Sequence, residues 1–170
     1  MNHWSDSLVE LNACEVAVGW CRKQPDPAAA WQACERADWM LWLAGRLSGQ
    51  VGDPRRVTLA LACADCTDTV PQSPIGAECL RVLRAWASGE ATIQCVRTAA
   101  YAASPAVSAA AYAAYATYAA YSYAAYAAAS AASAKADAAV FKDRETAWLA
   151  HTKVMCEIVK RHYPKAPVLE

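Results

Sequence analysis

The sequence has no excess of charge of either sign. Its 170 residues include 16 Lys and Arg and 16 Asp and Glu, so the formal net charge at neutral pH is zero. Non-specific binding to nucleic acid needs a basic surface that displaces counterions, and electrostatic docking to a membrane needs a polybasic cluster. The composition therefore argues against nucleic acid and against a membrane surface as partners.

The sequence also lacks the common patterns of catalysis, secretion and β-structure. It contains no GxGxxG, GxxxxGK[ST], HExxH or GxSxG motif, and its three histidines are scattered. We therefore expect no enzyme, no catalytic residue, no metal and no cofactor. The N-terminus has neither the basic region nor the apolar run of a signal peptide, which favours a cytoplasmic location. No segment alternates polar and apolar residues with β-branched enrichment, so we predict no sheet.

The eight cysteines mostly stand among Ala and Leu in helical patterns. A free Cys in such a setting behaves as a small buried hydrophobe, and without a secretion signal we expect the thiols to be reduced. Cys63 and Cys66 form a CxxC, but no second pair or suitably spaced His accompanies them. We predict two core sulfurs there; a metal or redox site is the alternative.

Proline marks the beginnings of helices along the chain. Pro is tolerated at the first helical position, and a preceding Asp or Ser can cap the free amides. This pairing occurs at Asp26-Pro27, Asp53-Pro54, Ser73-Pro74 and Ser104-Pro105. Each pair is predicted to begin a helix.

The helical segments together predict an all-α single-domain bundle of about seven helices over residues 1–170. The first helix is expected to open with a Ser7–Glu10 capping box and to run to about Lys23. The second is expected to carry AAAWQACERADWMLWLAGRL without interruption. A length of 170 residues suits one domain with a sizeable core.

An Ala/Tyr-rich helix at about residues 105–135 is the most distinctive expected element. Residues 99–139 contain 24 Ala and seven Tyr, and no charge stands between Arg97 and Lys135. Continued to residue 162, this helix would be roughly 85 Å long, whereas a domain of this size is only about 40 Å across. We therefore predict a break near Ser130–Asp137.

A helix without charge on any face must be covered on most sides. One possibility is a central core helix whose tyrosines fill space. The interpretation that we favour is that the segment lines a homo-oligomer interface, a ligand pocket, or both. A transmembrane helix ranks well below these, because no Leu, Ile or Phe fills the middle of the segment.

The spacing of the tyrosines predicts an aromatic stripe on this helix. An interval of 11 residues makes nearly three turns, so Tyr112 aligns with Tyr123 and Tyr115 with Tyr126, each within about 20°. Two further tyrosines point to the other side. Tyr has a large apolar body and a polar tip, which suits both a ligand and an interface. The candidate ligand or interface residues on this helix are Tyr112, Tyr115, Tyr118, Tyr121, Tyr123 and Tyr126.

The tract WQACERADWMLWL places charge beside apolar surface. Glu35, Arg36 and Asp38 stand between tryptophans, and such groups are usually paired when they are buried. We favour an internal ion-pair cluster; the alternative is an Arg or acid exposed to a pocket. Arg36 and Trp39 join the candidate ligand residues, as does Arg97, because an arginine near the stripe could hold a phosphate.

Three tracts carry a resemblance to a known family: AAAWQACERADWMLWLAGRL, RRVTLALACADC and LRVLRAWASGEAT, followed by the Ala-rich segment. Together they resemble the bacterial and phage "immunity protein" family, whose members are all-helical with an Ala-rich C-terminal half. The resemblance covers about residues 5–130. It implies neutralisation of a target by binding. The dense tyrosines depart from the Ala/Arg/His pattern that is more usual in that family.

Two targets fit such a protein. One is a toxin protein; the other is a nucleotide-derived immune signalling molecule, which phage anti-defence "sponge" proteins sequester. Tyrosine rings on an alanine helix offer a stacking surface for bases, worth roughly 1–3 kcal/mol per base, and a toxin inhibitor more often has a strongly charged face. We therefore predict a nucleotide-binding sponge that forms a homo-oligomer, with the toxin inhibitor as the alternative. An ice-binding helix ranks last, because such helices repeat Thr rather than Tyr.

Overall fold

The computed structural model describes residues 3–49, 53–103, 108–115, 126–127, 130–131, 133 and 144–169. Helices, turns and coil make up this part of the chain and no strand occurs in it, which confirms the all-α prediction. The helices of the described residues are α1 (Asp6–Glu10), α2 (Glu15–Cys21), α3 (Pro27–Ala33), α4 (Ala37–Arg46), α5 (Pro54–Thr67), α6 (Pro74–Ala87), α7 (Ile93–Ala103), α8 (Ser108–Tyr115) and α10 (Arg144–His162).

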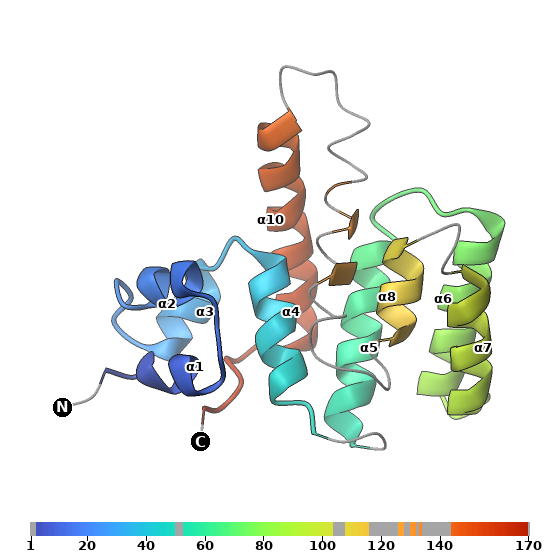
Figure 1. Cartoon of the computed structure of the whole chain (residues 1–170), viewed down its shortest axis with the longest axis horizontal. Coiled ribbons are helices and arrows are strands. Elements are labelled where there is room, and N and C mark those ends of the chain that lie inside the picture. Colours follow the sequence, from blue (N-terminus) through green and yellow to red (C-terminus); the bar gives the residue numbers. More distant parts are fainter. Residues whose placement is uncertain are drawn as a thin grey trace.

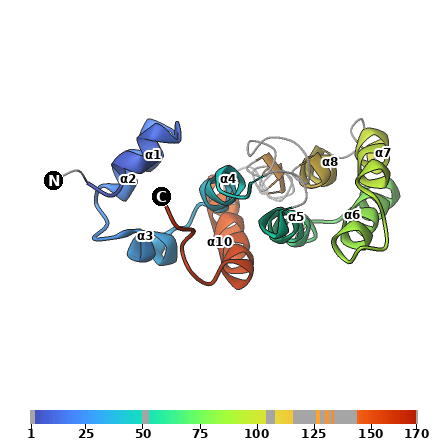
Figure 2. The same ribbon diagram turned by 90° about the horizontal axis from the view of Figure 1, so that it is seen from below.

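The helices form an elongated arrangement (Figures 1 and 2). Helices α1–α3 lie at one end, and α6 and α7 lie at the other. Between them, α10 packs against both α4 and α5, and α8 packs against α5, α6 and α7. The core runs through this middle part and includes the fully buried Leu41, Leu59, Leu80 and Met155.

Three of the four predicted Asp-Pro or Ser-Pro caps are confirmed. In each, the side-chain oxygen accepts a hydrogen bond from an amide of the first turn, which satisfies one of the free donors there. The three are Asp26 (2.8 Å from the Ala29 amide), Asp53 (2.8 Å from the Arg55 amide) and Ser73 (3.2 Å from the Gly76 amide). The fourth, at Ser104, lies outside the described residues.

The prediction of one first helix from Ser7 to Lys23 is wrong. The chain forms α1 and α2 with a turn between them, at which Asn12 has a φ of 62°. Asn adopts this left-handed conformation more readily than most residues. The capping box is also absent: the residue before α1 is Ser5, and its side chain makes no cap hydrogen bond.

The prediction of an unbroken second helix is wrong as well. Helix α3 ends at Ala33 and α4 begins at Ala37, with Cys34 and Arg36 in extended conformations between them. The break lets the two halves face different neighbours. Trp31 of α3 contacts the C-terminal end of the chain, while α4 packs against α5 and α10. The break at Asn12 and the break between α3 and α4 each add one helix, so the described residues contain nine helices instead of about seven.

The Ala/Tyr segment is described only in parts. Helix α8 covers Ser108–Tyr115, and Tyr118, Tyr121 and Tyr123 lie outside the described residues. The rings of Tyr112 and Tyr126 lie 5.5 Å apart, whereas fourteen residues of straight helix span about 21 Å. These two residues therefore do not belong to one straight helix. The predicted break between 130 and 137 is described only at residues 130, 131 and 133, and it stays a prediction.

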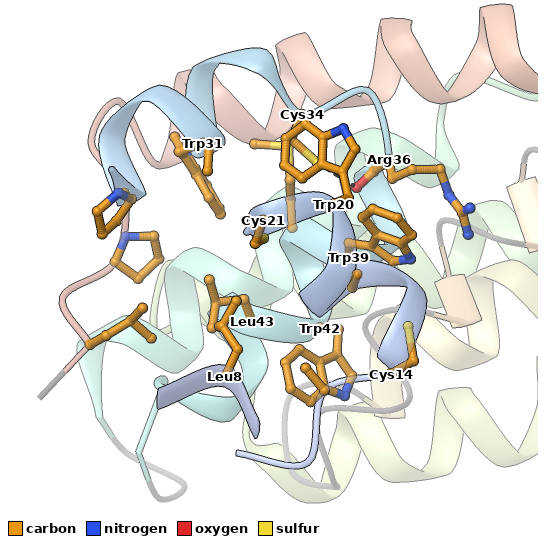
Figure 3. Close-up of a pocket in the computed structure, with 18 of the residues that line it drawn as sticks. Leu8, Cys14, Trp20, Cys21, Trp31, Cys34, Arg36, Trp39, Trp42 and Leu43 are labelled. Carbon is orange, nitrogen blue, oxygen red and sulfur yellow. Dashed lines mark hydrogen bonds between the residues drawn. The ribbon is translucent and has the colours of Figure 1, made fainter. Parts of the chain in front are cut away.

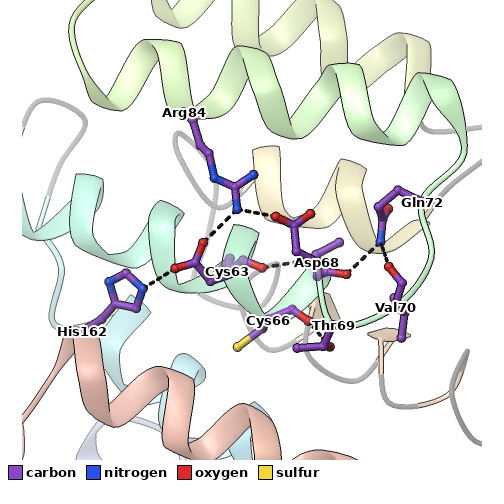
Figure 4. A network of polar contacts seen from close by, with 10 residues as sticks. Cys63, Cys66, Asp68, Thr69, Val70, Gln72, Arg84 and His162 are labelled. Atoms are coloured by element: carbon purple, nitrogen blue, oxygen red, sulfur yellow. Dashed lines mark hydrogen bonds and ion pairs between the residues drawn. The ribbon is translucent and has the colours of Figure 1, made fainter.

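A polar network joins the helices α5, α6 and α10 (Figure 4). One oxygen of Asp65 lies 2.8 Å from Nη2 of Arg84, and the other lies 2.9 Å from Nε2 of His162. Arg84 also donates to Asp68, at 2.5 Å. Burial alone would raise the pKa of Asp65, but the hydrogen bonds and charges of Arg84 and His162 outweigh it and leave that pKa below its ordinary value.

This lowered pKa predicts how Asp65 affects stability in acid. A carboxyl group with a lower pKa in the folded state stabilises the protein above its unfolded pKa of about 3.9, and that contribution is lost as the pH falls through the folded pKa. Asp65→Asn should therefore lower the free energy of unfolding at pH 7, by no more than about 1 kcal/mol because the Asp65 side chain is 41% exposed.

Urea unfolding from pH 7 down to pH 2.5 measures this effect. The difference between wild type and Asp65→Asn should shrink below about pH 4. Glu78→Gln is the control, because Glu78 pairs with Arg81 on the exposed surface of α6 and should change little at any pH. An Asp65→Asn difference that stays constant across the pH range would contradict the role given to Asp65.

Candidate functional site

A cavity of about 470 Å³ lies among α1, α2, α3, α4 and the C-terminal tail, residues 164–169 (Figure 3). This volume falls in the range of small-molecule sites. We call the cavity the tryptophan pocket, because five of the seven tryptophans of the chain line it: Trp4, Trp20, Trp31, Trp39 and Trp42.

Helix α4 forms the inner wall of the pocket, because the side chains that line it are spaced to lie on one face of the helix. Trp39, Trp42 and Leu43 are three and four residues apart, so they share one face, and all three line the pocket. Leu41 and Ala44 are buried in the main core. One helix thus presents one face to the pocket and another to the core.

Trp31 fixes α3 to the base of the C-terminal tail. Its side chain is 4% exposed, and its Nε1 donates a hydrogen bond to the carbonyl of Tyr163 at 2.9 Å. The two rings also meet edge to face, with centroids 6.4 Å apart. On another wall, the rings of Trp20 and Trp39 lie 6.2 Å apart and tilted by 59°. The aromatic walls therefore come from separate helices.

Arg36 is held at one end of the pocket by three side chains. Its Nε and Nη2 donate to the two carboxylate oxygens of Asp38, at 2.9 and 2.7 Å. Its guanidinium carbon lies 4.6 Å from the ring centroid of Trp39 and 4.9 Å from that of Trp148. Both distances are within cation–π range. The hydrogen bond to Asp38 is the main cause that raises the pKa of Arg36, so this guanidinium remains charged.

Among the described residues that line the pocket, Arg36 and Asp38 are the only charged side chains, and they neutralise each other. Arg36 and Asp38 are paired, but the favoured internal cluster is not formed: the pair joins residues two apart, and both members line a pocket, as the alternative had it. Glu35 instead pairs with Lys153 on the surface, at 2.8 Å. Three thiols also line the pocket, and burial raises the pKa of the Cys21 thiol to about 11. The pocket is apolar, with one neutralised charge pair.

The structure brings together two of the residues that the sequence predicted to bind a ligand, Arg36 and Trp39. Arg97 is exposed on α7, at the opposite end of the molecule from the pocket (Figure 2). Tyr112 and Tyr115 are half-buried against the core, and Tyr126 is 53% exposed. None of these tyrosines lines the tryptophan pocket. The remaining three candidates, Tyr118, Tyr121 and Tyr123, are outside the described residues.

Sequence reasoning missed Trp20, Trp31 and Trp148. The first two line the pocket, and the third covers one face of the Arg36 guanidinium. The only available signal was the number of tryptophans, seven in 170 residues. Their grouping depends on contacts between helices far apart in the sequence, so the spacing within any one helix could not reveal it.

The CxxC thiols lie in the main core, as predicted. Cys63 and Cys66 both have an exposed fraction of 0%, and burial raises the pKa of each thiol. The described part of the chain contains no group of three or more His, Cys, Asp or Glu side chains arranged to hold a metal ion. All eight cysteines are free, and five of them are buried.

Comparisons with protein-family models, with curated proteins and with solved structures find no match for this chain. The resemblance to the immunity protein family stays a prediction. In the described residues, no helix combines the length and the apolar character that crossing a membrane requires.

Proposed function

We propose that this protein is a non-catalytic binding protein that sequesters a small nucleobase-bearing molecule. The setting that we propose is immunity or anti-defence, with a nucleotide-derived signalling molecule as the ligand. The observation that carries the proposal is the tryptophan pocket, in which five indoles surround one cavity of about 470 Å³.

The indole walls suit a flat ligand. Stacking a base on an aromatic side chain contributes roughly 1–3 kcal/mol of binding free energy. This holds for any type of base, because every base has a π-face. Trp20 and Trp39 come from different helices and are tilted relative to each other, so the pocket offers more than one aromatic face. We therefore place the proposed stacking surface on the tryptophans instead of the tyrosines.

The charges of the pocket limit which part of such a ligand it can hold. Arg36 uses one N–H of Nε and one of Nη2 for Asp38, which leaves the two N–H groups of Nη1 and one of Nη2 to donate to a ligand. The Asp38 carboxylate opposes any further negative charge nearby. We therefore place the base inside the pocket and at most one phosphate group beside Arg36, with other phosphates outside.

Mass spectrometry of the molecules released on heating tests the proposal. The protein is purified from infected or induced cells, heated, and the soluble fraction is analysed. We expect a nucleobase-bearing molecule at about one per chain, and less of it in a Trp39→Ala sample prepared in parallel. A co-purifying protein with no such molecule would instead favour the toxin inhibitor.

The charge-free stretch between Arg97 and Lys135 supports a second proposal, that the chain forms a homo-oligomer through its Ala/Tyr segment. Tyr126, in this segment, is 53% exposed. Light scattering at micromolar concentration should give a dimer or larger for the wild type. Tyr126→Lys should shift the mass toward the monomer, because a charge in an apolar interface is costly.

Val154→Lys is the matched control for Tyr126→Lys. Val154 on α10 is also 53% exposed, so its substitution adds the same charge at the same exposure but outside the Ala/Tyr segment. A monomeric wild type, or equal dissociation by both variants, would refute the proposed interface.

A further inference from the structure

The C-terminal tail, residues 164–169, forms a wall of two cavities. Ala166, Pro167 and Leu169 line the tryptophan pocket. Pro167 and Leu169 also line a second cavity of about 540 Å³, together with Val168 and residues of α1 and α4. The same short segment therefore separates one cavity from the other.

Hydrogen bonds from the other described residues hold the tail only at its base. The carbonyls of Tyr163 and Pro164 accept hydrogen bonds from Trp31 and Gln32, at 2.9 and 3.4 Å. Beyond them, residues 165–169 make no hydrogen bond to any other described residue. Only side-chain packing, chiefly of Ala166, Pro167 and Leu169, keeps this part of the tail in place.

A segment with few hydrogen bonds and little buried surface can detach locally. The free energy that this opening requires is a small fraction of the free energy of global unfolding. We propose that the tail is a displaceable wall of the tryptophan pocket, which swings away from its base at Pro164 and joins the two cavities into one open site. The inference rests on the proposed function in one respect, since it names the route by which the ligand reaches the pocket.

The cysteines of the chain report this opening without any ligand. Cys21 and Cys34 line the pocket; Cys34 is 7% exposed and Cys21 is half-buried. Burial raises the pKa of both thiols, which slows their alkylation because the thiolate is the reactive form. Cys95 on α7 is exposed and should react at the same rate in every variant. Cys63 is fully buried in the core and reports global unfolding.

The experiment compares alkylation rates by iodoacetamide, measured for each cysteine by peptide mass spectrometry in the full chain. In Leu169→Ser, Cys21 and Cys34 should react about tenfold faster than in the wild type, which corresponds to about 1.4 kcal/mol in the opening equilibrium. Val168→Ser is the matched control, since Val168 is 77% exposed and does not line the tryptophan pocket. It should leave both rates unchanged.

Equal rates for Cys21 and Cys34 in wild type and Leu169→Ser would overturn the proposal. Equal acceleration by Val168→Ser would overturn it too. If Cys63 also reacts faster in Leu169→Ser, the variant has opened the core, and the milder Leu169→Ala is judged by the same two rates. Because no ligand is present, a protein that binds no nucleobase-bearing molecule would still show the displaceable tail, so the two proposals fail separately.

Discussion

Replacing Trp31 by Ala is expected to lower the free energy of unfolding by about 3–5 kcal/mol, the usual cost of removing a large buried aromatic side chain. Trp31 is 4% exposed, packs edge to face on Tyr163 and donates a hydrogen bond to the Tyr163 carbonyl. The variant loses all three contributions and separates α3 from the C-terminal end of the chain. Urea unfolding followed by circular dichroism measures the change.

Trp31→Phe separates packing from hydrogen bonding at this position. Phenylalanine keeps much of the apolar volume but has no donor for the Tyr163 carbonyl. Trp31→Phe should therefore lower the free energy of unfolding by about 1 kcal/mol, the contribution of the lost hydrogen bond. If the free energy of unfolding of Trp31→Ala is less than about 1 kcal/mol below that of the wild type, α3 contributes little to the fold. The account of the pocket wall would then be wrong.

Replacing Trp39 by Ala is expected to weaken ligand binding by about 1–3 kcal/mol, or roughly 5- to 150-fold in the dissociation constant, if its ring stacks a base. The variant also removes one of the two rings against the Arg36 guanidinium, which Asp38 and Trp148 would still hold. Calorimetric titration with the molecule released from the wild type measures the change in affinity.

Two further variants locate the binding surface. Trp86→Ala on α6 removes a half-buried indole that does not line the pocket, so it should leave the affinity unchanged. Tyr115→Ala should lower stability instead of affinity, because Tyr115 packs against the core. A loss of affinity in Tyr115→Ala with none in Trp39→Ala would return the ligand to the tyrosines.

The helix beginnings that the sequence predicted correctly depend on local chemistry. Asp53 and Ser73 each precede a proline and cap the amides of the first turn, so neighbouring residues determine where α5 and α6 begin. The breaks at Asn12 and at Cys34–Arg36 are different. Both occur where the helical pattern continues. Asn12 permits the left-handed turn at the first, and at the second the two halves pack against different neighbours.

The candidate site was predictable only in part, for the same reason. The tract around Arg36 and Asp38 indicated charge beside indoles, and the structure shows that pair at one end of a pocket. The tyrosine spacing gave a stripe on a single straight helix, but the contact of Tyr112 with Tyr126 excludes that geometry. The grouping of Trp20, Trp31 and Trp39 depends on how three helices pack, which no spacing within one helix encodes.

Isothermal titration calorimetry of the purified 170-residue chain tests the central claim most directly. The titrants are nucleosides, mononucleotides, cyclic dinucleotides and ADP-ribose derivatives, each measured at several temperatures. We predict that at least one binds at one molecule per chain with a negative heat capacity change, the mark of apolar surface buried on binding, and that Trp39→Ala weakens it. No binding of any titrant to a folded protein would contradict the claim.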